Sequence, residues 1–187
     1  MSGWDFFRSE KKYVLLQRSY NITGGLNDSI CLKAPFRPIV YQNNTLEKTF
    51  TYRNMSSTYK LDLPGGAAIW PSARFLMEFS AKDSTPAKVA RVDPLNYVNS
   101  TFIYAAHGYN IPAPTWKFRY CDETCAVIEV LSKHKNMTGD STCELWVRVG
   151  LKETLYLSAQ TEACKSYFQT SCYTSYPTQV YIPSLCN

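Results

Sequence analysis

Residues 121–149 read CDETCAVIEVLSKHKNMTGDSTCELWVRV, with two runs of alternating apolar residues on either side of a polar turn. Alternation with a period of two is typical of strands that bury one face. The runs at 126–130 and 143–149 therefore predict two strands of an antiparallel sheet. The same stretch contains three cysteines and one histidine, so it also raises the possibility of a metal site, a catalytic site or a set of disulfides.

The same alternation recurs in short runs along the chain, separated by turn residues such as Gly65-Gly66 and Asp93-Pro94. Further strands are expected at 12–20, 47–54, 58–64, 73–81, 88–93 and 100–107, while residues 116–132 form one bent strand or two. Residues 21–38 are expected to form a long polar connection. About eight strands without intervening helices predict an all-β meander that closes into an antiparallel barrel.

Two helices are expected outside the strands. Residues 3–11 form a short amphipathic opening, GWDFFRSEK. Near the C-terminus, 161–172 carries cysteines and aromatic residues at helical spacing, with Ser158 or Thr161 available as a cap. We expect a single domain over 1–187, with the barrel at about 12–150, the helix at about 159–172 packed on the barrel wall, and a tail at 173–187.

Parity along each strand predicts which side chains share a face. The inward faces are rich in large aromatic residues and almost free of charge. The predicted lining comprises Phe50, Tyr52, Leu61, Phe75, Met77, Phe79, Phe102, Tyr104, Trp116, Phe118, Ile128, Trp146 and Arg148. An eight-stranded barrel is either filled by its side chains or able to hold one small ligand, and parity leaves both possibilities open.

The cysteines do not match a metal site or a nucleophile. Cys121 and Cys125 have an acceptable spacing for zinc, but Cys143 stands alone and His134 lies among lysines, so a second ligand pair is missing. A nucleophile would need a base, and His107 and His134 are the two histidines of the chain. No G-x-S-x-G, H-E-x-x-H or G-x-G-x-x-G motif is present. Paired carboxylates for glycoside chemistry stay open, but the acidic residues fall mostly in turns or on outward faces, so we expect no enzyme activity, no metal and no cofactor. The seven cysteines then indicate disulfides, with one left unpaired or bonded to another molecule.

Composition excludes several classes of protein. The net charge of +5 is carried by scattered lysines and arginines, which argues against a nucleic-acid partner. No apolar run is long enough to span a membrane.

The compartment of the protein is indicated by its first residues and its sequons. The chain begins MSGWDFF without the apolar region of a signal peptide, so it is either cytosolic or has lost a leader. Six N-x-S/T sequons together with the cysteines favour a secreted, extracellular protein. The predicted glycosylation sites are Asn21, Asn27, Asn43, Asn54, Asn99 and Asn136.

Taken in order, the segments YVLLQRSYN, ICLKA, CAVIEV, CELWV and EACKSYF, followed by a cysteine at the C-terminus, resemble the salivary lipocalins of ticks, the histamine-binding-protein family. The resemblance implies an eight-stranded lipocalin barrel with a helix on its wall, secreted in saliva. It also implies a small host mediator held in the barrel, such as histamine, serotonin, a leukotriene or a sterol. Trp4 resembles the tryptophan that closes the base of lipocalin barrels, although GWDFF departs from the family's spacing around it.

The resemblance also implies disulfides between Cys31 and Cys186 and between Cys125 and Cys164. Cys121, Cys143 and Cys172 lie beyond that two-bridge pattern. We expect Cys143 to bond Cys172, leaving Cys121 free, while the other pairings of these three cysteines stay open.

The ligand class follows from the charges on the predicted lining. Histamine would need an inward carboxylate, but Asp62, Glu78 and Glu129 face away from the aromatic residues. Glu144 shares the face of Trp146 and Arg148, and its charge could be neutralised by the arginine. We therefore expect a mainly apolar ligand, a sterol or lipid, ahead of a biogenic amine. The other class of function is a surface-acting immunomodulator with a filled barrel that binds a protein of host immune cells.

Overall fold

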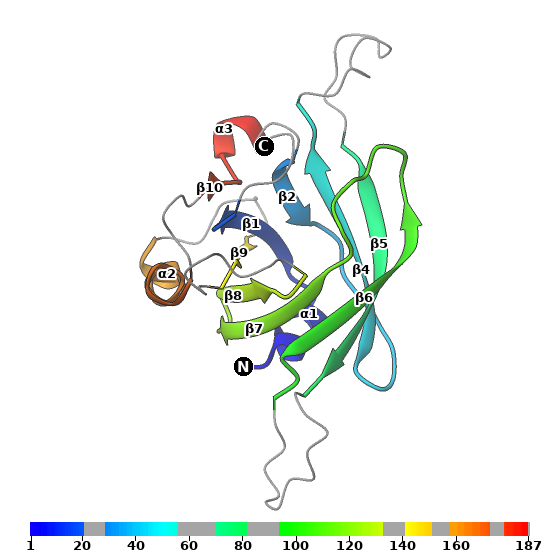
Figure 1. The fold of residues 1–187 in the computed structure, drawn as a ribbon, viewed down its shortest axis with the longest axis horizontal. Coiled ribbons are helices and arrows are strands. Elements are labelled where there is room, and N and C mark those ends of the chain that lie inside the picture. Colours follow the sequence, from blue (N-terminus) through cyan, green and yellow to red (C-terminus); the bar gives the residue numbers. More distant parts are fainter. Residues whose placement is uncertain are drawn as a thin grey trace, which may run out of the picture.

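Eight strands form one closed antiparallel barrel in a computed structural model of the chain (Figure 1). The structure describes residues 1–20, 29–55, 70–81, 94–132, 141–150, 158–172 and 178–186. The barrel strands are β1 (Lys12–Arg18), β2 (Ile30–Ala34), β4 (Thr45–Arg53), β5 (Ser72–Ser80), β6 (Tyr97–Ala105), β7 (Thr115–Cys121), β8 (Cys125–Val130) and β9 (Cys143–Val149). The barrel closes where β1 pairs with β9, from Lys12 opposite Val149 to Arg18 opposite Glu144. Two short strands extend the sheet: β3 (Ile39–Val40) pairs with β4, and β10 (Thr178–Gln179) pairs with β1.

The all-β barrel expected from the sequence is confirmed, with corrections to individual elements. Residues 30–34 form β2, although the whole segment 21–38 was expected to be a connection. This strand is buried on both faces, because Leu32 and Ala34 join the barrel core while Ile30 and Cys31 pack outside it. A strand covered on both faces lacks the polar–apolar alternation that marks the others. The strands expected at 58–64 and 88–93 lie outside the described residues.

Residues 116–132 form two strands rather than one bent strand, because Asp122 stabilises a tight turn between them. Its Oδ1 accepts hydrogen bonds from the backbone N–H groups of Thr124, at 2.7 Å, and Cys125, at 3.0 Å. These bonds satisfy backbone donors that no longer pair with a neighbouring strand. The chain therefore reverses at Asp122 and continues as β8 beside β7.

The first helix, α1 (Gly3–Arg8), closes one end of the barrel, which we call the base; the opposite end, where β1 ends, is the mouth (Figure 1). Ser2 and Asp5 form a capping box, in which the Ser2 hydroxyl accepts from the Asp5 N–H at 3.1 Å. Phe6 and Phe7 project into the barrel and are completely buried. Trp4, expected as the base tryptophan, is only partly buried and packs edge-on against Phe79, with ring centroids 5.4 Å apart.

The second helix, α2 (Ser158–Ser171), lies on the outer wall beside β8 and β9 (Figure 1). Two disulfides attach it there, Cys125–Cys164 and Cys143–Cys172. A third disulfide, Cys31–Cys186, joins β2 to the short helix α3 (Pro183–Cys186). These are the two pairs that the resemblance implied and the expected third, and Cys121 is free. No helix within the described part of the chain is long and apolar enough to cross a bilayer.

Candidate ligand site at the barrel mouth

Four aromatic rings fill the centre of the barrel. The ring centroids of Phe50, Trp116 and Trp146 lie 5.7–5.9 Å from one another. Phe7 of α1 lies 5.8–6.2 Å from each of these three rings. Five of these six contacts are edge-on or tilted and one, Phe7 with Trp116, is stacked, and edge-on and offset-stacked contacts are the favoured arrangements of aromatic pairs. This ring cluster (Phe7, Phe50, Trp116 and Trp146) therefore closes the middle of the barrel.

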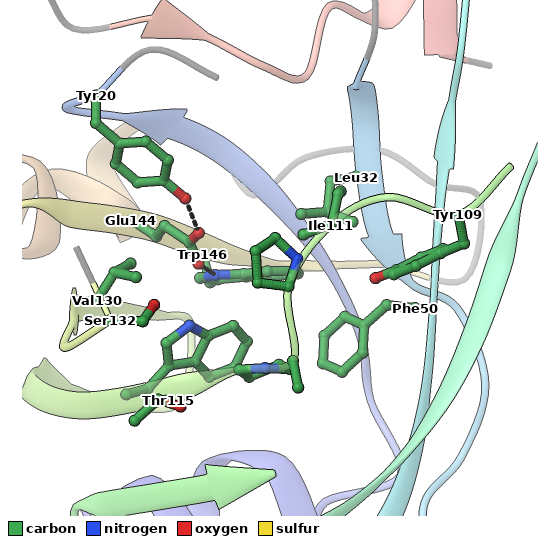
Figure 2. A pocket seen from close by; sticks show the side chains of 14 residues that line it. Tyr20, Leu32, Phe50, Tyr109, Ile111, Thr115, Val130, Ser132, Glu144 and Trp146 are labelled. Atoms are coloured by element: carbon green, nitrogen blue, oxygen red, sulfur yellow. Dashed lines mark hydrogen bonds between the residues drawn. The ribbon is translucent and has the colours of Figure 1, made fainter. Parts of the chain in front are cut away.

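A small cavity lies on the mouth side of the ring cluster (Figure 2). Its volume is about 40 Å³. The lining residues are Tyr20, Leu32, Phe50, Tyr109, Ile111, Pro112, Ala113, Pro114, Thr115, Trp116, Val130, Ser132, Glu144 and Trp146. Pockets for drug-sized ligands measure about 300–1,000 Å³. A ligand of that size would have to displace part of this lining.

The segment 106–114 forms one wall of the cavity and is held by Tyr52. The Tyr52 hydroxyl donates to the backbone oxygen of Gly108 at 3.0 Å and accepts from the N–H of Asn110 at 3.1 Å. Tyr109 packs against Tyr52 with ring centroids 5.3 Å apart. Burial raises the pKa of the Tyr109 phenol far above its ordinary value, so Tyr109 presents a neutral hydroxyl to the cavity. This segment supplies five lining residues from outside the barrel strands, and it is the wall that an entering ligand could move.

A buried carboxylate faces the cavity among the aromatic rings. Glu144 is 5% exposed and accepts hydrogen bonds from the Tyr20 hydroxyl and from Nε1 of Trp146, the latter at 2.8 Å (Figure 2). Burial raises the pKa of the Tyr20 phenol, and the adjacent Glu144 charge raises it further, so Tyr20 remains a donor. The carboxylate oxygens retain lone pairs for a further donor.

Arg18 lies directly opposite Glu144, since the two residues pair across β1 and β9. Arg18 is 1% exposed and donates to Ser29 Oγ at 3.1 Å. Burial lowers the pKa of its guanidinium, while Tyr20 and Glu144 raise it. Glu144 is one of the cavity-lining residues and Arg18 is not, so a ligand would meet the carboxylate first. Arg148, considered as a partner of Glu144 from the sequence, instead lines a hollow with Glu10 and Lys11.

The predicted lining residues fall into five groups. Phe50, Trp116 and Trp146 line the mouth cavity. Six others are buried in the barrel core without lining that cavity: Tyr52, Phe75, Met77, Phe79, Phe118 and Ile128. Leu61 lies outside the described residues. Arg148 lies at the base, and the remaining two, Phe102 and Tyr104, are exposed.

The exposure of Tyr104 is explained by a bulge in β6. Phe102 pairs with Phe75 and Tyr104 with Arg74, so Ile103 is an extra residue opposite a single step of β5. A bulge of this kind reverses the parity that the sequence predicts. Tyr104 consequently points outward and is 62% exposed, which corrects its assignment to the lining. Phe102 still contacts the Phe75 ring at 4.6 Å but is 48% exposed, because β6 pairs with β7 only up to Asn99.

Sequence reasoning missed several functional candidates. Tyr20, Tyr109 and Ile111 lie in segments that were expected to be strand ends or connections, where parity carries no information. Lys48 was also missed, although it shares the inward face of Phe50. Lys48 is 1% exposed, and within the described residues its Nζ has no hydrogen-bond partner and lies over the rings of Phe7 and Tyr13. Burial lowers the pKa of Lys48 to about 8.

The remaining sequence motifs can be placed on the structure. Asp122, Cys125 and Cys164 lie together, but both cysteines are in one disulfide and cannot act as thiolate ligands. His134 lies outside the described residues, and His107 is exposed after β6. Among the sequons, Asn43 and Asn99 are exposed and Asn54 is half-buried, whereas Asn21, Asn27 and Asn136 lie outside the described residues.

Comparison with known proteins identifies relatives of this barrel. A family model described as tick histamine binding protein matches residues 2–187. No curated protein sequence is a match. Among solved structures, japanin from Rhipicephalus appendiculatus bound to cholesterol is similar, with a TM-score of 0.57 and 16% sequence identity over 97% of this chain and 98% of japanin. At that identity the likeness shows a shared lipocalin fold.

Proposed function

Because the chain belongs to the tick histamine-binding protein family, we propose that it sequesters a small host mediator at the mouth of its barrel. The disulfides support the proposal that it is a secreted protein, since such bonds persist in oxidising compartments. Removing a mediator from the bite would reduce the host's inflammatory response, which is the biological role we propose. A binding role of this kind requires no catalysis.

The main support for the class of ligand is the buried carboxylate of Glu144, which lies beside three aromatic rings. An ammonium or imidazolium group is attracted by the faces of aromatic rings and by a carboxylate shielded from water. Phe50, Trp116 and Trp146 supply the rings, and Glu144 supplies the charge. This chemistry favours a compact amine over a sterol, which reverses the ranking expected from the sequence. The reversal arises because Arg148, the neutralising partner expected for Glu144, lines a separate hollow with Glu10 and Lys11.

Isothermal titration of the purified protein with histamine and serotonin tests this ligand class. We expect saturable binding that weakens at least tenfold in Glu144→Gln, which keeps the shape of the side chain and removes its charge. Glu123→Gln is the matched control, because Glu123 is exposed on the β7–β8 turn. An unchanged affinity in Glu144→Gln, or no uptake of either amine by the wild-type protein, would refute the amine assignment.

A sterol or lipid is the second candidate ligand, and the aromatic interior favours it. Burial of apolar surface contributes about 25 cal/mol per Å², and similarity to a cholesterol-bound lipocalin supports the idea. The cavity of about 40 Å³ has to expand for either class of ligand, and a sterol requires the 106–114 wall to move further outward than an amine does. Native mass spectrometry of the protein, before and after incubation with cholesterol, would reveal such a ligand by its mass.

A filled barrel that acts through its surface on a host immune-cell protein is a further alternative, and the ring cluster favours it. The centre of the barrel is occupied by Phe7 together with the three rings that it contacts. In that case the activity on host cells should survive Glu144→Gln and any change of ring that leaves the fold intact. An assay of cytokine release by host cells would separate this function from sequestration.

A further inference from the structure

Three adjoining hollows at the base end of the outer wall share residues and form one continuous surface. The largest, of about 390 Å³, is lined by Lys11, Lys12, Arg37 and Arg148. A smaller neighbour shares Lys12, Pro35 and Val149 with it and adds Lys33. A third hollow, of about 340 Å³, shares Arg37 and adds Arg74. We call the cations of this surface the basic track: Lys33, Lys12, Lys11, Arg148, Arg37 and Arg74.

The basic track carries a local excess of positive charge. Among the described residues, six cations and two carboxylates, Glu10 and Glu47, line the three hollows. The cations come from four separate parts of the sequence. Their scattered positions hid the cluster from sequence analysis.

Among the described residues, neither of these carboxylates forms an ion pair with Lys11 or Lys12. Glu10 pairs with Arg37 at 2.9 Å, with side chains 67% and 75% exposed. Glu47 pairs with Arg74 at 3.6 Å. The Glu10–Arg37 pair is exposed, and exposed pairs contribute little to stability, so an incoming anion could compete for Arg37. Lys11 and Lys12 are exposed and available to the same anion.

We propose that the basic track binds a linear sulfated polysaccharide. Arginine binds sulfate through two parallel hydrogen bonds and lysine through a compact charge, and clusters of both are typical of heparin-binding surfaces. Consecutive hollows that share lining residues suit a narrow chain with anionic groups repeated along it. A single phosphate would use one hollow, and a flat bilayer surface would not enter any of them. This proposal is independent of the ligand in the barrel.

Titration with a heparin decasaccharide at two salt concentrations tests the proposal. We expect the affinity to fall with salt, because each neutralised anion releases counterions. The double variant Lys12→Glu/Arg37→Glu should bind at least tenfold more weakly and show a shallower salt dependence. The control Lys117→Glu/Lys165→Glu makes the same change in net charge on β7 and α2, away from the track, and should change the affinity less than threefold.

Other outcomes would overturn the assignment. Equal losses in the two double variants would mean that net charge alone attracts the saccharide. A single-stranded oligonucleotide of equal charge that binds as tightly, with the same loss in the track variant, would mean that the track recognises polyanions without regard to the sugar. Thermal unfolding monitors the fold, and Lys12→Gln/Arg37→Gln replaces the charge reversal if that variant does not fold.

Discussion

The ring of Phe7 is stacked against the indole of Trp116, with centroids 5.8 Å apart and an interplanar angle of 24°. Phe7 belongs to α1, whereas Trp116 belongs to the barrel wall and lines the mouth cavity. The floor of the candidate ligand site is therefore provided by a helix outside the sheet. A substitution in α1 that moves Phe7 should therefore change the shape of the cavity.

We expect Phe7→Ala to destabilise the protein by about 3–5 kcal/mol, because it removes a completely buried ring and leaves a void beneath Trp116. Urea unfolding followed by tryptophan fluorescence measures the loss. Phe36→Ala is the control, since Phe36 is 60% exposed and its removal should cost less than about 0.5 kcal/mol. A Phe7→Ala protein as stable as wild type would show that the helix does not pack as described.

Gly3 is predicted to be intolerant of any side chain. A Cβ at this position would lie 2.2 Å from Cδ2 of Phe118, a ring that is itself buried in the barrel. Gly3→Ala should therefore destabilise the protein by about 1–3 kcal/mol, despite the higher helix propensity of alanine. In a protein that already carries Phe118→Leu, adding Gly3→Ala should lower the free energy of unfolding by less than it does in the wild-type protein. Full stability of Gly3→Ala would contradict the close contact.

Lys48→Met should stabilise the protein at pH 7 by about 1–3 kcal/mol, because it removes a buried charge that lacks a hydrogen-bond partner among the described residues. The side chain is 1% exposed, and methionine fills a similar volume without the charge. Chemical denaturation at pH 7 measures the difference. A less stable variant would show that the ammonium has a favourable role in the folded state.

The pH dependence of the free energy of unfolding of the wild-type protein and of Lys48→Met provides a second measurement. The pKa of Lys48 is lowered from 10.5 to about 8 in the folded state, so above pH 8 the folded protein loses this proton while the unfolded chain keeps it. The free energy of unfolding should consequently rise with pH in this window, by about 1 kcal/mol between pH 7 and 9. This rise should be absent from Lys48→Met, so the difference between the two proteins should shrink as the pH increases.

The three disulfides should contribute unequally to stability. Cys31–Cys186 spans 155 residues, whereas Cys143–Cys172 spans 29. In the chain-entropy model the longer loop contributes about 5 kcal/mol and the shorter one about 4 kcal/mol. Cys31→Ala/Cys186→Ala should therefore unfold at a lower urea concentration than Cys143→Ala/Cys172→Ala. The reverse order would indicate that anchoring of α2 matters more than the entropy of the unfolded chain.

The sequence by itself determined the class of fold, because alternation along a strand is a local property that survives in any sheet with one buried face. Phe75, Met77 and Phe79 alternate in this way, and all three are buried in the core. Parity became unreliable where the chain departs from regular pairing. β2 escaped notice because both its faces are covered, and Tyr104 was assigned inward because a bulge cannot be seen in the spacing of residues.

Tertiary structure alone decided what occupies the barrel. The two phenylalanines of α1 close its interior, and the pairing of β1 with β9 brings Arg18 beside Glu144. Cations from distant segments likewise meet on one surface only after the barrel has closed. These are contacts between residues far apart in the chain, and no local pattern encodes the distance between them. The sequence therefore specified a barrel rich in aromatic residues, while long-range packing set how much room remains inside it and which charges face that room.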